Sequence, residues 1–328
     1  MFFTALAVGS QSVGGVEAFL VIGAYFLTSK QLRIERQNIR IGESFWHRIK
    51  RLYPIYLVLL CVFTVLLVAA KRKLIAEPLW YLFSLQNFRC LFDTATYSLD
   101  AFLGHFWYIG LDVWLFLIWI VIMRLVPRKH LRIAFVESLI IGLLWRTSFI
   151  LLRPDNMSLS YMIPVGQLDC WSIGGLVALN VNEKGVNNKA MWVEMIAGFV
   201  GILVIIAYNA HLHSTSFTRG YLCFRGAEGY MDNPITGNIH IFIALLSAGL
   251  LRYCIDTTKK RPLLSAAPMV ALGGMTYELY CFHLPIRFGV GYFIKNDILM
   301  IIAALITTIG VSLLWNKLAM PVIKRVIH

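Results

Sequence analysis

The stretch that decides the fold reads Arg48-Ile49-Lys50-Arg51-Leu52-Tyr53-Pro54. It places three cations within four residues, at the start of an apolar run over 54–70. Another apolar run, 14–28, precedes it and contains a single acid, Glu17. Two interpretations of the cations are open at this point. They mark the cytoplasmic side of a bilayer, or they bind an anionic ligand at that side.

Composition indicates that most of the chain lies in lipid. The 328 residues are 59% hydrophobic and only 14% charged, with a mean hydropathy of +0.71. A soluble domain averages about 45–50% apolar and about 25% charged residues, so a soluble fold of this size has no means of hiding this much apolar surface. The formal charge of +13 is spread over short connections between apolar runs. This is a pattern of membrane topology and not of a nucleic-acid-binding face.

Nine apolar segments follow one another along the chain, and most approach the ~20 residues that a helix needs to cross a bilayer. Backbone groups in lipid must be satisfied within the segment, so we expect helices and not the short alternating strands of a barrel. We therefore predict an all-α, polytopic membrane helix bundle of about nine transmembrane helices, a single domain over 1–328 with no soluble domain. The segments are 14–28, 54–70, 105–126, 133–152, 164–181, 191–209, 239–255, 271–289 and 298–320.

The connections alternate in cation density, which sets the orientation. Segment 29–53 carries seven Lys and Arg residues, and the odd-numbered connections are denser in cations than the even ones, with the Lys71–Lys73 cluster as the exception. Lys and Arg concentrate on the cytoplasmic side, so we expect 29–53 and the C-terminus to be cytoplasmic in a plasma (inner) membrane. This orientation puts Met1 outside, and we expect a missing upstream helix as the simplest reason.

Five ordered motifs resemble those of the acyltransferase 3 family, whose members are multi-spanning membrane acyltransferases. Each motif is a weak signal alone, whereas their common order and spacing are specific. They are GVEAFLVIGAYFL over 15–27, RIKRLYP over 48–54, HFWY over 105–108, Leu168-Asp169 followed by Gly174, and TYELYCFHLP over 276–285.

The chain also departs from the family pattern. Family members begin with a helix that carries an arginine and a histidine taken to be the catalytic base, and this chain starts just past the position of that histidine. The resemblance therefore implies that the first of the family's ten helices is lacking. Gln167 stands where the family often has arginine, Ala24 replaces a usual serine, and Ala319 stands where many members have glutamate.

The resemblance implies an acyl-CoA donor, most simply acetyl-CoA, with its nucleotide end at the cytoplasmic face. Arg48 and Arg51 share one helix face at i,i+3, and arginine binds phosphate through a planar fork of donors. Lys50 lies beside them, and Tyr53-Pro54 is expected to bend the chain into the next helix. We predict Arg48, Arg51, Lys50 and Tyr53 as the donor-binding residues; a plain cytoplasmic anchor is the alternative.

Three ionisable residues inside apolar segments are the catalytic candidates: Glu17, Asp169 and His283. Charged groups in a membrane are costly and mark functional sites by default. Glu17, paired with a histidine, would orient the imidazole and stabilise its charged form; an acid in interfacial water is the alternative. His283 would exchange a proton or bind the acceptor hydroxyl, and a helix–helix hydrogen bond is its alternative.

The sequence thus predicts a membrane O-acyltransferase that moves an acyl group from acyl-CoA to a hydroxyl of a cell-surface polysaccharide or glycan precursor. The reaction, donor and sugar acceptor are implied by the family resemblance. His211 and His213 have no third ligand at a clear spacing, so no metal is expected. Two alternatives stay open: an export component for a polar glycan, and an inactive family member that acts in a polysaccharide-synthesis complex.

Overall fold

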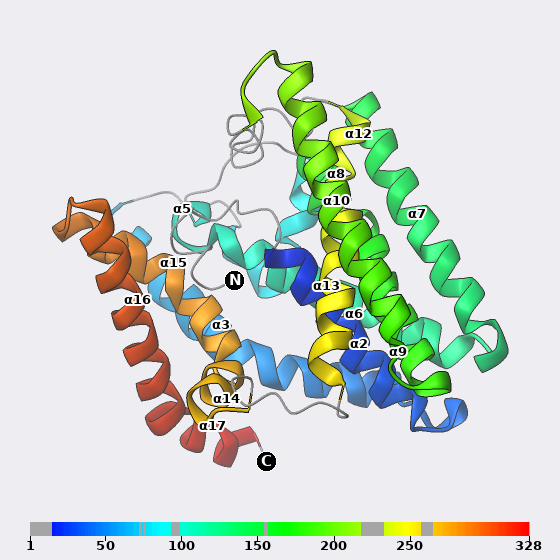
Figure 1. The fold of residues 1–328 in the computed structure, drawn as a ribbon. Coiled ribbons are helices and arrows are strands. Elements are labelled where there is room, and N and C mark those ends of the chain that lie inside the picture. Colours follow the sequence, from blue (N-terminus) through cyan, green and yellow to red (C-terminus); the bar gives the residue numbers. More distant parts are fainter. Residues whose placement is uncertain are drawn as a thin grey trace.

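A computed structural model describes residues 15–71, 74, 77–92, 99–153, 157–217, 233–256 and 265–327. Every regular element in these ranges is a helix (Figure 1). The longer helices are α2 (Gly15–Leu32), α3 (Ile41–Ala69), α6 (Trp107–Leu125), α7 (Leu131–Leu152), α9 (Leu168–Lys184), α10 (Asn188–Leu212), α13 (Ile239–Ile255), α15 (Thr276–Phe293) and α16 (Asp297–Leu314).

Short helices complete the chain between and after these long ones. The α-helical ones are α4 (Glu77–Leu82), α5 (Asp100–Leu103), α8 (Met157–Tyr161), α12 (Pro234–Gly237), α14 (Ala267–Gly274) and α17 (Met320–Ile327). Tighter 3₁₀ turns are η1 (Arg36–Asn38), η2 (Gln86–Leu91), η3 (Gly104–Phe106), η4 (Arg128–His130) and η5 (Pro164–Gln167). The segment η6 (Trp315–Ala319) is a π-helix that joins α16 to α17.

The predicted all-α membrane bundle is confirmed. Each of the nine predicted apolar segments coincides with one of the long helices. Among the described residues, six helical segments are long and apolar enough to cross a membrane. They are Ile41–Ala69, Gly104–Leu125, Arg128–Leu152, Asn188–Leu212, Pro234–Ile255 and Asp297–Ile323. The remaining helices α2, α9 and α15 are 18, 17 and 18 residues long.

The outer helices expose apolar side chains, as a lipid environment requires. On α10 the exposed side chains recur at helical spacing and form one stripe, made of Trp192, Val193, Ile196, Phe199, Val200, Leu203 and Val204. The helix α16 carries a similar set, which includes Ile298, Leu299, Ile302, Ile306, Leu313 and Leu314. Such continuous apolar surfaces are unfavourable in water and favourable against acyl chains.

One packing centre is built around α2, which lies between α9, α13 and α6. Its core includes Leu20 and Val21 of α2 with Trp119 and Trp171. Gly174 makes the close approach of α2 and α9 possible, because a Cβ at this position would lie 2.2 Å from the Val21 carbonyl oxygen. Small residues at helix crossings are the usual means of bringing membrane helices together.

A second packing centre joins α3, α5 and α15. Its core includes Ile55 and Tyr56 of α3, Leu103, Phe106 and Cys281. In Figure 1, α3, α15 and α16 lie on the opposite side of the molecule from α7 and α10. The helix α6 contacts α2 of the first group and α3 of the second, so the two groups meet along α6.

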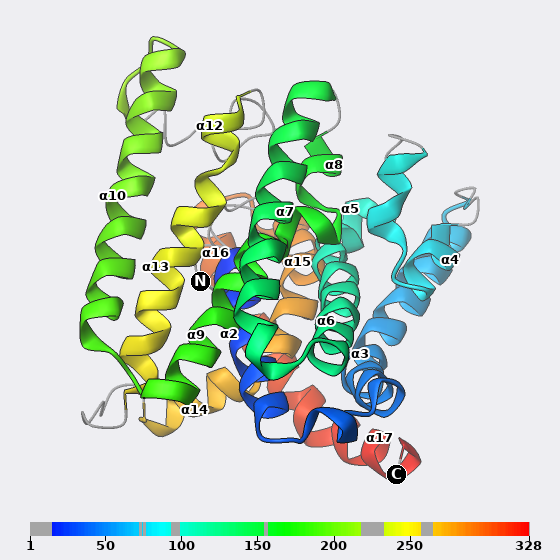
Figure 2. The ribbon, with the colours of Figure 1, turned by 90° about the vertical axis from the view of Figure 1, so that its right-hand side faces the viewer.

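Cation-rich connections gather at one end of the bundle. Arg128 donates to the carbonyls of Leu32 and Ile34, and Arg36 donates to the carbonyl of Leu125. These bonds join the connection after α2 to the one after α6. The C-terminal ends of α2 and α9, together with α14 and α17, lie at the lower end in Figure 2, while α8 and α12 lie near the upper end.

The segment Arg48–Pro54 lies inside a helix and not at a helix entry. The helix α3 starts at Ile41, and Pro54 is in its interior. The residues before the apolar run are polar enough to leave lipid, yet they continue the same helix. A proline inside a helix leaves one backbone carbonyl without its hydrogen bond. Membrane helices tolerate this where neighbouring groups donate to that carbonyl.

Candidate active site

A cavity of about 520 Å³ lies where α2, α3, α6, α15 and η6 meet. The polar and charged side chains on its wall are Arg48, Arg51, Asp112, Thr276, Glu278 and Asn316. Aromatic side chains provide much of the remaining wall, namely Phe19, Tyr108, Tyr277, Tyr280 and Trp315. One wall is a π-helical segment, an irregularity that occurs frequently at functional sites. The cavity therefore combines two cations and two acids with hydrogen-bonding groups and flat apolar surfaces.

Arg48 is held on the cavity wall by a two-pronged ion pair with Asp112. Its Nη2 lies 2.6 Å from Oδ1 and 2.5 Å from Oδ2 of Asp112, and its Nε lies 3.1 Å from Oδ2. The guanidinium also lies over the ring of Phe116, at 5.4 Å from the centroid. This fork geometry fixes the plane of the guanidinium. Asp112, a lone acid in its apolar segment, is thus the partner that orients Arg48.

Arg51 supplies a second cation to the same cavity. It lies one helical turn after Arg48 on α3, so both reach the same face as the i,i+3 spacing predicts. Within the described ranges Arg51 has no ion-pair or hydrogen-bond partner. Its charge is therefore available to an anionic ligand.

Lys50 and Tyr53 lie on a different face of α3. They line a separate apolar groove of about 1050 Å³, together with Trp46 and Trp114. The Tyr53 hydroxyl is 2.8 Å from the Ser84 hydroxyl. The structure thus brings Arg48 and Arg51 together in one cavity and does not bring Lys50 and Tyr53 to it.

The opposite wall of the cavity is the first part of α15. Glu278 is only 8% exposed, and its Oε2 has no hydrogen-bond partner among the described residues. Tyr277 donates to the carbonyl of Leu52 at 2.6 Å, which ties α15 to α3. Tyr280 donates to the carbonyl of His105. The two tyrosines hold this wall in place, and Glu278 is an acidic residue of the cavity lining.

His283 lies behind this wall and packs against a second histidine. Its Nδ1 is 2.6 Å from the carbonyl oxygen of Tyr280, one turn back on the same helix. Its ring is 5.0 Å from that of His105, centroid to centroid, in an edge-on arrangement. His105 Nε2 lies 3.2 Å from the Cys281 carbonyl oxygen. His105 is buried against α15.

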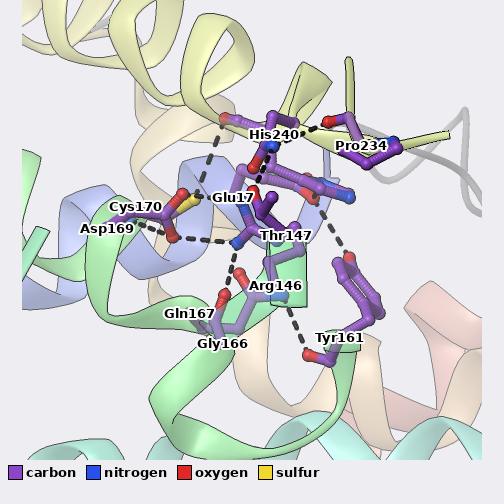
Figure 3. Close-up of polar contacts among 11 residues, drawn as sticks. Glu17, Arg146, Thr147, Tyr161, Gly166, Gln167, Asp169, Cys170, Pro234 and His240 are labelled. Atoms are coloured by element: carbon purple, nitrogen blue, oxygen red, sulfur yellow. Dashed lines mark hydrogen bonds and ion pairs between the residues drawn. The ribbon is translucent and has the colours of Figure 1, made fainter. Parts of the chain in front are cut away.

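A buried polar cluster inside the bundle contains Glu17 (Figure 3). The carboxylate has no exposed surface, and its Oε1 is 2.5 Å from Nδ1 of His240, which is also fully buried. The Tyr161 hydroxyl donates to the same oxygen at 3.0 Å. The alternative of an acid in interfacial water does not fit, because the side chain has no exposed surface and is bonded to His240 of α13 and Tyr161 of α8. Glu17 is paired with a histidine, as its proposed role requires.

Asp169 forms a second, fully buried ion pair next to this cluster (Figure 3). Arg146 lies 2.7 Å from Oδ2 and 2.9 Å from Oδ1 of Asp169, and neither side chain has exposed surface. Arg146 also donates to the carbonyl of Gly166. Asp169 accepts in addition from the backbone N–H of Cys170 at 2.8 Å. The pair therefore joins α7, η5 and the first turn of α9.

Aromatic side chains connect the Glu17 cluster with the cavity. Phe19, two residues after Glu17 on α2, lines the cavity, and its ring lies 6.0 Å from that of Tyr108. The neighbouring Trp107 contacts Tyr161 at 5.2 Å, centroid to centroid. A chain of aromatic contacts thus leads from the cavity wall to the cluster.

Sequence reasoning missed His240 and Arg146. Both lie inside predicted apolar segments, 239–255 and 133–152, and the rule that selected Glu17 applies to them equally. For candidate metal ligands, no group of three His, Cys, Asp or Glu side chains within the described ranges lies close enough to hold an ion.

The helical bundle, its membrane-length helices and its buried ionisable site define a multi-pass integral membrane protein. The chain belongs to the acyltransferase 3 family: the family's sequence model, described as an acyltransferase domain, matches residues 3–316. This confirms the resemblance stated from the five motifs.

Relatives in Staphylococcus aureus carry the name O-acetyltransferase OatA. Those of strains NCTC 8325 / PS 47 and COL are each 24% identical over 340 residues, which is 95% of this chain and 52% of theirs. The chain spans about half the length of these relatives. No solved structure matches it.

Proposed function

We propose that this protein is a membrane O-acyltransferase that moves an acetyl group from acetyl-CoA to a hydroxyl of a cell-surface polysaccharide or glycan precursor. Membership of the acyltransferase 3 family supports the reaction class. The name of the Staphylococcus aureus relatives, O-acetyltransferase, supports acetyl as the group and an oxygen as its acceptor. In this proposal both substrates bind to the part of the bundle that lies in the lipid bilayer.

The observation that carries the proposal is the cavity with Arg48 and Arg51 on one wall. Acetyl-CoA has a pyrophosphate and a separate phosphate at its nucleotide end, and guanidinium groups bind such oxygens with paired, charge-assisted hydrogen bonds. Arg48 is oriented in advance by Asp112, and Arg51 carries a charge that no described residue neutralises. The aromatic walls suit the adenine ring. Lys50 and Tyr53 line the groove, so we do not include them in the proposed donor site.

The proposed orientation puts this end of the bundle in the cytoplasm, where acetyl-CoA is made. The connections after α2 and α6 are rich in Lys and Arg and are joined to each other by hydrogen bonds from Arg128 and Arg36. Cations in short connections favour the cytoplasmic side. The C-terminal helix α17 is at the same end in Figure 2. We therefore propose a plasma (inner) membrane protein with a cytoplasmic C-terminus.

The proposed chemistry is an acyl transfer in which the acceptor hydroxyl attacks the thioester carbonyl. The new bond joins the acceptor oxygen to the acyl carbon, the carbon–sulfur bond breaks, and coenzyme A leaves as a thiol once it receives a proton. The step needs a base for the hydroxyl proton and positioning of both substrates. In this proposal Glu17 acts on an imidazole, and His283, which lies behind the α15 wall, binds the acceptor hydroxyl. Asp169 is a positioning residue that acts through Arg146.

The test is transfer of label from radiolabelled acetyl-CoA in inverted membrane vesicles that contain the overproduced protein and a bacterial glycan acceptor. We expect ester-linked label in the glycan that mild alkali releases. The matched control is the Arg51→Gln variant at equal abundance, which should lose most of the transfer. Vesicles that bind or move the glycan without incorporating label would overturn the proposal and favour an export component.

A further inference from the structure

The pair formed by Glu17 and His240 is a buried hydrogen bond between a carboxylate and an imidazole, a group that can take up and release a proton near neutral pH. Its two members come from helices far apart in the chain, α2 and α13. Both side chains are fully buried. Burial of a carboxylate and an imidazole is costly unless they are hydrogen-bonded, and replacement of such a pair by apolar residues is often neutral or stabilising. A fold that retains the pair in its interior therefore points to use of its proton chemistry.

The contact selects one tautomer of His240. Glu17 is bound at Nδ1, at 2.5 Å, so the ring proton is on Nδ1 and points at the carboxylate. The ring nitrogen with the lone pair is then Nε2, as in a carboxylate–histidine pair that acts as a general base. The same carboxylate stabilises the imidazolium that forms when Nε2 takes a proton.

The surroundings of the imidazole support this assignment. Tyr161 of α8 donates to Glu17, and its ring lies 4.7 Å from that of His240. On α9, Asp169 is bound to Arg146 of α7, so its charge is compensated. Cys170 contacts the His240 backbone carbonyl at 3.8 Å and not the ring. On α10, Glu194 pairs with Arg252 near the other end of α13. Among the carboxylates of the described residues, Glu17 is thus the one bonded to the ring nitrogen Nδ1.

We propose that His240 is the general base of the acyl transfer and that Glu17 is its positioning residue; this inference rests on the proposed function. His240 Nε2 takes the proton of the acceptor hydroxyl as its oxygen forms the ester bond to the acyl carbon. The carbon–sulfur bond breaks, and the imidazolium returns its proton to the departing coenzyme A sulfur. No atom, electron or proton is left over, and the ring is regenerated.

The position of His240 fits a donor that binds by its phosphates at Arg48 and Arg51. Tyr108 on the cavity wall is linked to His240 by ring contacts through Trp107 and Tyr161. The pantetheine arm of the donor lies between its phosphates and its thioester, so the reacting carbon is expected beyond the phosphate site and toward this wall. His240 has no exposed surface, so a covering side chain must move when both substrates bind. Catalytic contacts commonly tighten only in the substrate complex.

The experiment measures kcat, the KM for acetyl-CoA and the pH dependence of kcat for the purified protein in nanodiscs. The variants are His240→Asn and Glu17→Gln, with His130→Asn, at an exposed histidine in η4, as the matched control. We expect His240→Asn to lower kcat by at least about 100-fold, the scale of general-base catalysis, with little change in KM or in acetyl-CoA binding. The acidic limb of the pH profile should disappear. Glu17→Gln should lower kcat and shift that limb, and His130→Asn should match the wild type.

Two results would overturn the inference. One is a His240→Asn or Glu17→Gln variant that binds acetyl-CoA normally and keeps the kcat and pH profile of the wild type. The other is equal loss of donor binding and turnover in both variants, which is the sign of a structural role. Failure of the proposed function is distinguishable, because then the wild type itself transfers no acetyl group.

Discussion

Removal of the positive charge of Arg146 measures how much the buried ion pair with Asp169 contributes to the stability of the protein. Arg146→Met keeps a long side chain, and it leaves the carboxylate of Asp169 without the guanidinium that now binds both of its oxygens. It also leaves the Gly166 carbonyl without its donor. Both effects fall on groups in the interior, where water cannot replace the lost partner.

The expected cost follows from the burial of the pair. Removal of one partner of a buried ion pair costs about 3–5 kcal/mol. The same change in Arg132, on the same helix α7, breaks a pair with Glu183 whose side chains are 44% and 47% exposed. Exposed pairs contribute about 0.2–1 kcal/mol. With about 2–4 °C per kcal/mol for a chain of this size class, Arg146→Met should lower the Tm by roughly 6 °C or more, and Arg132→Met by no more than roughly 4 °C.

The assay is thermal unfolding in one detergent, followed by the loss of monodisperse protein on size exclusion after heating. The double variant Arg146→Met with Asp169→Leu should recover part of the lost stability, because no charge then stays buried alone. Equal Tm shifts for Arg146→Met and Arg132→Met would refute the reasoning. So would a double variant less stable than Arg146→Met alone.

Two further predictions concern packing and the donor site. Gly174→Val should destabilise the α2–α9 contact by at least about 2 kcal/mol through overpacking, because its Cβ would meet the Val21 carbonyl; Gly310→Ala, where a Cβ meets nothing within 4 Å, should change stability by less than about 1 kcal/mol. Equal thermal shifts for the two would contradict this account of the helix crossing. Lys50→Gln should leave acetyl-CoA affinity nearly unchanged, because Lys50 lines the groove and not the cavity; a loss as large as that of Arg51→Gln, measured by equilibrium binding, would return Lys50 to the donor site.

The helices were predictable because lipid imposes a strong and local rule on the sequence. An apolar run as long as the bilayer is thick predicts a helix without any knowledge of the rest of the chain. Each of the nine predicted segments is a helix in the structure. The start of α3 was not predictable in this way. The residues over 41–53 mix apolar side chains with one acid, one histidine and three cations and belong to no apolar run, yet they continue the same helix.

Local sequence signals selected several residues of the candidate site but could not indicate their contacts. Local spacing put Arg48 and Arg51 on one helix face, and the cost of charge in lipid selected Glu17. Nothing local indicates that Glu17 meets His240, which lies 223 positions further along the chain. Lys50 lines the groove and not the cavity for a geometric reason: a side chain two positions after Arg48 points to another side of the helix.

The most direct test of the central claim is equilibrium binding of acetyl-CoA to the purified protein in nanodiscs, for the wild type and for Arg51→Gln. Charge-assisted hydrogen bonds contribute about 1.5–3 kcal/mol, so the variant is expected to bind roughly 10-fold to 150-fold more weakly. Its helical content and Tm should stay those of the wild type, because no described residue pairs with Arg51. An Arg51→Gln variant that binds acetyl-CoA as tightly as the wild type would contradict the assignment of this cavity to the acyl donor.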